Sequence, residues 1–242
     1  MDDNRRRSRP GDGPDRVYAA LRHAIIGRAI APGAPLPEGE VAGRFGVSRT
    51  VVRAALTRLI ENGLAVRPAN RGTRVAAPSL ADAHDTMAIR RGVEGVVSAR
   101  LAGRLTAEQL ARLRAHVEAE EEAQGQDGAE AIRLSGEFHV RLAEATGSEL
   151  LLRYVSELVS RSSLALAANG PAAPGDCGPS EHRALLDALA RPDAPAACAC
   201  MDDHLLKLTQ RALRTPAPAT RFADLPPDSL TPAPGGFRCA SP

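Results

Sequence analysis

Three histidines in the C-terminal half of the chain have the side chains best suited to bind a metal. His139, His182 and His204 lie on three separate stretches of helical periodicity. Neutral imidazole nitrogens bind zinc, nickel and other divalent transition metals, and three of them leave coordination positions open for water or a carboxylate. If the three helices pack as a bundle, the rings can converge in its core. The alternative is that each is a partly buried structural histidine, because spacing alone does not show convergence.

A second set of polar residues begins a helix in the N-terminal third. Ser48, Arg49 and Thr50 stand at its start, and Arg53 follows one turn after Arg49 on the same face. An arginine at the start of a helix in the major groove can contact guanine O6 and N7 in a bidentate manner. Ser48 and Thr50 can bond phosphates, aided by the helix dipole. These residues indicate DNA recognition; the alternative is a solvated basic helix face.

The elements that position these residues are short helices. Apolar periodicity predicts helices over 15–28, 38–45 and 48–62. Gly46 suits the tight turn between the last two, and Ser48 is a suitable N-cap for the third.

A small hairpin is expected after the third helix. Strand-like runs at 64–68 and 73–76 flank a polar turn. Arg71 and Gly72 lie at its tip, where arginine is drawn to a narrow minor groove and glycine permits close approach. Helix, tight turn, helix and hairpin together predict a winged helix-turn-helix, whose second paired helix reads the major groove.

The charge is unevenly distributed along the 242 residues. Residues 1–79 carry 14 arginines and 7 acidic residues, a formal charge of +7, whereas the remainder carries −5. A basic first third and an acidic remainder indicate a polyanion-binding module attached to a second domain.

The rest of the chain is predicted to be helical, which gives a mainly α fold class with a C-terminal all-helical bundle. The expected helices lie near 80–103, 106–124, 129–146, 148–167, 180–190 and 194–215. The expected divisions are a disordered arm at 1–13, the winged helix-turn-helix at 14–76, a linker at 77–80, an effector-binding and dimerisation bundle at 81–215, and a disordered tail at 216–242.

Neither a membrane span nor a secretory signal is expected. No apolar run approaches the length that crosses a bilayer, and the charged N-terminus lacks a hydrophobic region. We therefore expect a cytoplasmic protein with no membrane partner. Its cysteines, at 177, 198, 200 and 239, show no metal-binding spacing and are expected to be reduced thiols.

The DNA-reading segment resembles the N-terminal signature of GntR-family bacterial repressors. The similarity runs through Leu36-Pro37-Glu38-x-Glu40-Val41-Ala42, then Phe45-Gly46-Val47-Ser48-Arg49-Thr50-Val51-Val52-Arg53, and ends at a wing, Arg71-Gly72-Thr73-x-Val75. Many members carry a DNA-contacting arginine at the position of Gly39, so the resemblance implies that affinity or operator preference differs here.

The segment from about 80 to 211 resembles the FadR-type ligand-binding domain, also called FCD. Many members bind a metal through an Asp or Asn and three histidines, and His139, His182 and His204 match the three. Ser135 stands where the acidic ligand is expected, so the resemblance implies three protein ligands, with Ser135 holding a water.

The resemblance also implies an effector contact. Family members carry an arginine one turn before a glutamate on the first helix of this domain, a spacing that Arg90 and Glu94 fit. Arg90 can bind an effector carboxylate in a bidentate manner. The alternative is a surface ion pair between the two, and Arg91 is the fallback for the effector contact.

The leading hypothesis is a ligand-responsive transcriptional repressor with no enzymatic activity and no catalytic residues. It is expected to bind a pseudo-palindromic double-stranded DNA operator as a homodimer, under control of a small organic acid. The alternatives are a ligand-independent DNA-binding protein and a metal-dependent hydrolase with an appended DNA-binding head. The hydrolase lacks support from any H-E-x-x-H, nucleophile-elbow or P-loop motif.

Overall fold

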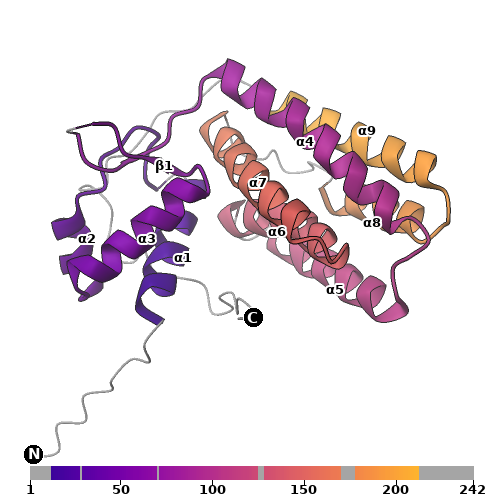
Figure 1. Cartoon of the computed structure of the whole chain (residues 1–242), viewed down its shortest axis with the longest axis horizontal. Helices are drawn as coiled ribbons and strands as arrows, with labels where there is room; N and C mark the ends of the chain where they lie inside the picture. The colour runs from indigo at the N-terminus through magenta and orange to yellow at the C-terminus, as the bar shows by residue number, and fades with distance from the viewer. Residues whose placement is uncertain (1–11, 28, 70, 125–127, 170–177, 213–242) are drawn as a thin grey trace, which may run out of the picture.

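The computed structural model describes residues 12–27, 29–69, 71–124, 128–169 and 178–212. Within these ranges the chain forms an N-terminal domain of short helices and a larger helical bundle, joined at the start of α4 (Figure 1). The expected tail at 216–242 and most of the expected arm at 1–13 lie outside the described residues. The expected arm is too long, because α1 begins at Asp12.

The N-terminal domain contains three helices and a two-stranded sheet. The elements are α1 (Asp12–Ile26), α2 (Glu38–Phe45), α3 (Arg49–Glu61), β1 (Ala65–Val66) and β2 (Arg74–Val75). Gly46 ends α2 with a φ of 63°, a left-handed conformation that glycine adopts without steric cost. Two residues later the Ser48 side chain caps α3 by accepting the Val51 amide.

The wing is shorter than the sequence predicts. β1 and β2 pair antiparallel in the register Ala65 to Val75 and Val66 to Arg74. A third segment lies alongside, since Leu36 donates its amide to the Thr73 carbonyl at 2.8 Å. Pairing on both sides of β2 holds the hairpin onto the helices.

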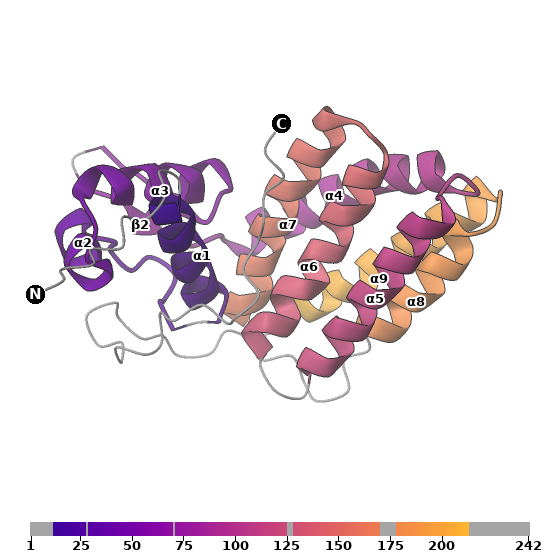
Figure 2. The same cartoon turned by 90° about the horizontal axis from the view of Figure 1, so that it is seen from below.

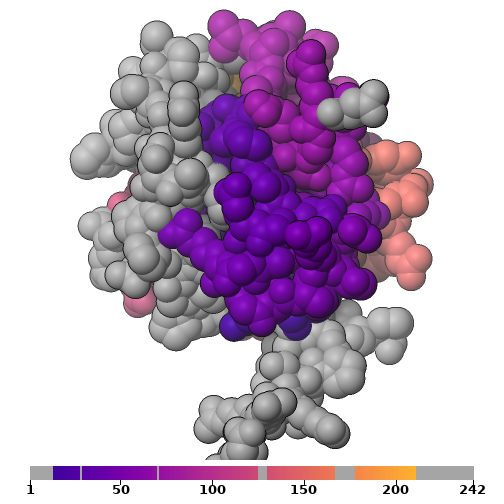
Figure 3. Space-filling model, turned by 90° about the vertical axis from the view of Figure 1, so that its left-hand side faces the viewer, coloured from indigo at the N-terminus to yellow at the C-terminus, as the bar shows by residue number. Residues whose placement is uncertain are grey.

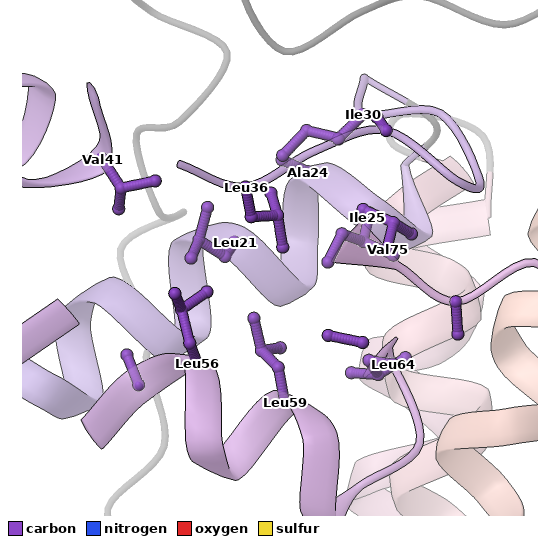
Figure 4. Packing of buried hydrophobic residues seen from close by; sticks show 14 of the residues in the cluster. Leu21, Ala24, Ile25, Ile30, Leu36, Val41, Leu56, Leu59, Leu64 and Val75 are labelled. Atoms are coloured by element: carbon purple, nitrogen blue, oxygen red, sulfur yellow. The ribbon is translucent and has the colours of Figure 1, made fainter. Parts of the chain in front are cut away.

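One apolar core holds the N-terminal domain together. Leu21 and Ile25 of α1 point toward Leu56 and Leu59 of α3, and Leu36, Leu64 and Val75 close the cluster (Figure 4). All of these side chains are 1% exposed or less. Burying a large aliphatic side chain stabilises a fold by roughly 1.5–3 kcal/mol, so this cluster fixes how α3 is presented.

Six helices form the C-terminal bundle within the described ranges. They are α4 (Leu80–Leu101), α5 (Ala107–Gln124), α6 (Gly128–Ala145), α7 (Glu149–Asn169), α8 (Gly178–Leu189) and α9 (Ala194–Ala212). Ser79 and Asp82 form a capping box that starts α4. α4 packs against α7 and α9, and α5 packs against α6 and α8. None of the helices within the described ranges is long and apolar enough to span a membrane.

The two domains share a packed boundary. α1 contacts α6 and α7, and these elements lie side by side in the turned view (Figure 2). Leu164 of α7 is 1% exposed and belongs to the hydrophobic core of the N-terminal domain. The bundle therefore contributes a side chain to the interior of the domain that carries α3.

Candidate metal centre and nucleic-acid interface

The structure brings the three histidines together from three different helices. His139 comes from α6, His182 from α8 and His204 from α9, and their ligand atoms all lie within 4.8 Å of one another. Each side chain is at most 3% exposed. The convergence that spacing alone could not show is present.

Each histidine is oriented by a carboxylate from a neighbouring element. The Nδ1 atom of His139 bonds Glu94, that of His182 bonds Glu120 at 2.7 Å, and that of His204 bonds Glu181 at 2.8 Å. A carboxylate accepts hydrogen bonds, so this arrangement places the proton on Nδ1 and leaves the Nε2 lone pair free. Carboxylate–histidine pairs of this kind orient the ligands of protein metal sites.

The free Nε2 atoms face one another in the centre. The Nε2 atoms of His139 and His204 are 3.2 Å apart, and the Nε2 atom of His182 is buried without a hydrogen-bond partner. Two facing lone pairs repel unless a cation lies between them, and a buried unpaired nitrogen is costly. The donor set and the unpaired nitrogen fit a divalent transition metal held by three imidazoles.

Burial keeps the imidazoles of His139 and His182 in the neutral form that binds metals. Burial lowers the pKa of His139 to about 3, although Glu94 opposes this effect, and it lowers the pKa of His182 well below its usual value. Burial tends to raise the pKa of Glu94, but Arg90 and His139 outweigh it and leave that pKa at about 2. Burial raises the pKa of Glu120 to about 7.

Ser135 lies beside this centre but its hydroxyl is directed to Glu120. The Ser135 side chain hydrogen-bonds the Glu120 carboxylate. Gly178, at the start of α8, lies against the same carboxylate, because a Cβ built on it would stand 3.0 Å from Glu120 Oε1. The position expected to hold a metal-bound water is thus engaged with a carboxylate from α5.

Arg90 shares a carboxylate with the histidine centre. Its Nε donates to Glu94 at 2.5 Å and its Nη1 donates to Ser162 at 2.8 Å, while the other oxygen of Glu94 bonds His139. Arg90 and Glu94 form an ion pair, but their side chains are only 2% and 1% exposed. The pair is therefore buried, and the alternative of a surface ion pair is wrong about its location. The Nη2 atom of Arg90 is buried without a partner. Arg91 is instead engaged by Asp202 at 2.6 and 2.9 Å.

Four of the residues expected to contact DNA lie at the N-cap and on the exposed face of α3. Ser48, Arg49, Thr50 and Arg53 are exposed, whereas the opposite face of the helix is buried. Arg53 donates to Glu38 of α2 at 3.0 Å. The N-terminal domain lies at one end of the molecule (Figure 1) and faces the viewer when the molecule is seen from that end (Figure 3).

Gly39 and the wing complete this surface. A Cβ at Gly39 would lie 3.6 Å from an Arg49 guanidinium nitrogen, so the Arg49 side chain reaches over Gly39. Arg71 and Gly72 are exposed at the wing, with Gly72 at a φ of 69°. Below them Arg67 donates to Thr73 at 3.1 Å and braces the hairpin.

Two protein families match this chain, one for each domain. Residues 14–75 match "Bacterial regulatory proteins, gntR family", and residues 85–207 match the FCD domain. The chain belongs to the GntR family. The family identifies this chain as a DNA-binding transcription regulator with an FCD domain.

Relatives of this GntR-family regulator cover both domains. The chain is 29% identical over 197 residues to the HTH-type transcriptional repressor RspR of Escherichia coli K12, covering 80% of this chain and 86% of that protein. It is 31% identical over 174 residues to a probable D-xylose utilization operon transcriptional repressor of Paenarthrobacter nicotinovorans, covering 72% and 76%.

Solved structures share the fold of this GntR-family chain. Escherichia coli McbR/YncC matches with a TM-score of 0.68 and 23% identity over 80% of this chain and 93% of that one. A GntR regulator from Rhodococcus sp. RHA1 matches with a TM-score of 0.65 and 24% identity, covering 83% and 97%. The mainly α fold class is confirmed by these matches together with the two family matches.

Sequence reasoning missed the part played by the carboxylates. Glu94 was considered only as the partner of Arg90 in a surface ion pair, whereas the structure buries that pair and adds a bond to His139. Glu120 lies in a run of acidic residues that resembles a solvated face. The available signal was its spacing from Leu113 and Val117, which share its buried stripe on α5.

Proposed function

We propose that this regulator is a repressor that binds a pseudo-palindromic operator as a homodimer and responds to a small carboxylate held at a metal centre. The observation that carries this proposal is the group of three converging Nε2 atoms. This group is linked to Arg90 because Arg90 and His139 both bond the carboxylate of Glu94. The names of two relatives as repressors support the direction of control.

For the metal, we propose that His139, His182 and His204 bind one zinc or nickel ion per chain through Nε2. The neutral state of His139 and His182 and the bonds of all three histidines to carboxylates support this assignment. A bound divalent ion would supply positive charge and open coordination positions for an oxygen ligand. Elemental analysis of the metal-exposed, desalted protein tests the assignment, with about one ion per chain expected.

For the effector, we propose that Arg90 binds the carboxylate of a small organic acid. Its buried Nη2 atom has no partner, and a guanidinium donates to carboxylates with favourable geometry. Calorimetric titration of metal-loaded protein with a panel of small carboxylic acids tests this role. A response to none of them would favour the ligand-independent DNA-binding alternative.

For DNA, we propose that Arg49 and Arg53 read base edges, that Ser48 and Thr50 bind phosphates, and that Arg71 enters the minor groove beside Gly72. Their exposure to solvent supports these roles. Arg53 would exchange its bond to Glu38 for one to a base. Selection of bound duplexes from a random pool should return a two-fold symmetric consensus.

For assembly, we propose that the outer face of α4 forms the dimer contact. Ile89 and Val96 are 56% and 46% exposed and lie on the same helix face as Gly92, which has open space beside it. Exposed apolar side chains grouped on one face mark interaction surfaces. A symmetric contact uses the same patch on both copies, which suits a single helix face.

A further inference from the structure

Glu120 is a buried carboxylate on a helix that carries none of the three histidines. It lies on α5, is 2% exposed, and accepts the Nδ1 proton of His182 at 2.7 Å. Ser135 of α6 hydrogen-bonds the same carboxylate. Three elements therefore meet at Glu120: α5, which supplies it, α6, which bonds it, and α8, which carries His182.

The charge of Glu120 is placed differently from the charges of the other two carboxylates. Glu94 is paired with the guanidinium of Arg90, and Glu181 is 13% exposed. Glu120 is held by a hydroxyl and by an imidazole that burial keeps neutral, and neither of these groups cancels its charge. A buried anion held by neutral groups is stabilised by a cation nearby.

We propose that Glu120, positioned by Ser135, acts through His182 on the metal centre. Its carboxylate supplies the negative charge that the serine at position 135 does not supply. This inference rests on the proposed metal site. Ser135 lies on α6 one turn before His139, which places the two residues on the same face of the helix. Its hydroxyl holds a carboxylate that comes from α5.

In this arrangement Glu120 is a positioning residue that acts through His182. By accepting the Nδ1 proton, Glu120 fixes the tautomer of His182 and makes its unpaired Nε2 a stronger donor. The backbone leaves room for it, because a Cβ at Gly178 would come within 3.0 Å of Glu120 Oε1. Gly178 therefore allows α8 to approach α5 closely enough for His182 to reach the carboxylate.

Zinc affinity of the full chain, measured by competition with a chromophoric chelator, tests the proposal. Glu120→Gln should weaken zinc binding by about 10–100-fold, the usual effect of losing such a partner. Glu121→Gln is the matched control, because Glu121 is the next residue on α5, is exposed and pairs with Arg183, and this change should leave zinc affinity unaltered. Ser135→Asp introduced into Glu120→Gln should restore most of the lost affinity, since the carboxylate then comes from position 135.

The outcomes separate this inference from the proposed function. Failure of the unchanged protein to bind zinc would overturn both. Equal zinc affinity in the unchanged protein and in Glu120→Gln would overturn only the role of Glu120. Loss of affinity that Ser135→Asp does not restore would identify Glu120 as a structural residue and also overturn the inference.

A milder pair of variants keeps the test decisive if Glu120→Gln does not fold. Ser135→Ala removes only the hydroxyl that holds the carboxylate, and it should weaken zinc binding without changing the unfolding temperature of metal-free protein. Ser180→Ala is the control for it, because Ser180 is an exposed serine on α8. Zinc affinity of Ser135→Ala equal to that of Ser180→Ala would overturn the proposal.

Discussion

Ser162 and Leu164 lie two residues apart on α7, and they belong to the interiors of different domains. Ser162 accepts a hydrogen bond from Arg90 at 2.8 Å beside the histidine centre, whereas Leu164 packs in the hydrophobic core of the N-terminal domain. Side chains two positions apart point to different sides of a helix. Movement of α7 that begins at Ser162 would therefore displace a core residue of the DNA-binding domain.

Leu164→Ala should destabilise the N-terminal domain although the residue lies in the bundle. Truncating a fully buried leucine typically costs about 2–5 kcal/mol, because the cavity left behind is only partly refilled. Leu150→Ala, on the same helix at a residue that is 56% exposed, is the control and should change the free energy of unfolding by under about 0.5 kcal/mol. Denaturant titration measures both, and equal values for the two variants would contradict the shared boundary.

Arg49→Ala should weaken operator binding by about 1–3 kcal/mol and relax the base preference at one position of each half-site. The reason is its exposed place at the first residue of α3. Arg104→Ala, an exposed arginine between α4 and α5, removes the same charge from the bundle and is the control. Fluorescence anisotropy at fixed salt measures both affinities, and an unchanged affinity of Arg49→Ala for its selected operator would rule out the contact.

His182→Ala should abolish stoichiometric metal binding and the effector response while leaving operator affinity within about threefold. The residue lies in the bundle, away from the exposed face of α3. His116→Ala is the matched control, since His116 is also a buried histidine but bonds the Leu134 carbonyl at 2.8 Å outside the centre. Elemental analysis and anisotropy test the pair; full metal content in His182→Ala would remove this residue from the ligand set.

The metal-free protein should lose stability as the pH falls from 6.5. In that range His139 and His182 gain protons when unfolded but stay neutral when folded, because burial lowers both pKa values. Glu120 acts in the opposite sense, since its folded pKa is raised to about 7 and the folded state takes up that proton first. Burial lowers the pKa of His116 as well, so three histidine protons in the unfolded chain oppose one proton on folded Glu120, and the free energy of unfolding falls by roughly 1–3 kcal/mol per pH unit.

The loss should steepen below pH 4.5. There Glu94 is protonated in the unfolded chain but keeps its charge in the folded protein, where its pKa is about 2. Urea titrations of chelator-treated protein at pH 7, 5.5 and 4 measure the slope, and His139→Gln should flatten it. A constant free energy of unfolding between pH 7 and 5 would contradict the assigned protonation states.

The sequence predicted the elements better than their contacts. The helix expected at 38–45 is observed with those bounds, because Gly46 and the Ser48 cap fix its surroundings locally. The observed strands have two residues each and are shorter than expected. The pairing of β2 with the segment before α2 was not predicted, because it has no local signal in the sequence. Local patterns record caps and periodicity, which are the interactions that set element boundaries.

The site was less predictable because it depends on packing angles. The sequence identified His139, His182 and His204 as candidate metal ligands, but spacing could not show that their Nε2 atoms lie within one centre. Burial of Arg90 likewise follows from how α4 packs on α7 and not from its spacing to Glu94. Long-range packing decides such contacts, and a single sequence contains no direct record of it.

Charged side chains on the outer face of α4 should break the proposed dimer contact. Ile89→Asp together with Val96→Asp should convert a species with the mass of two chains into one with the mass of a single chain, because a carboxylate left unpaired in an apolar contact is costly. Both residues are exposed, so the fold of the single chain should survive. Affinity for a two-half-site operator should fall at least about tenfold, since each domain then binds its half-site alone.

Leu206→Asp provides the control for this pair. Leu206 is a 39% exposed leucine on α9, outside the α4 face, and its replacement should leave the mass unchanged. Analytical ultracentrifugation measures the mass, and thermal unfolding shows whether each variant remains folded. A folded Ile89→Asp, Val96→Asp protein with the mass of two chains would place the dimer contact elsewhere on the bundle, because two buried carboxylates on each copy could not be accommodated at a symmetric α4 interface.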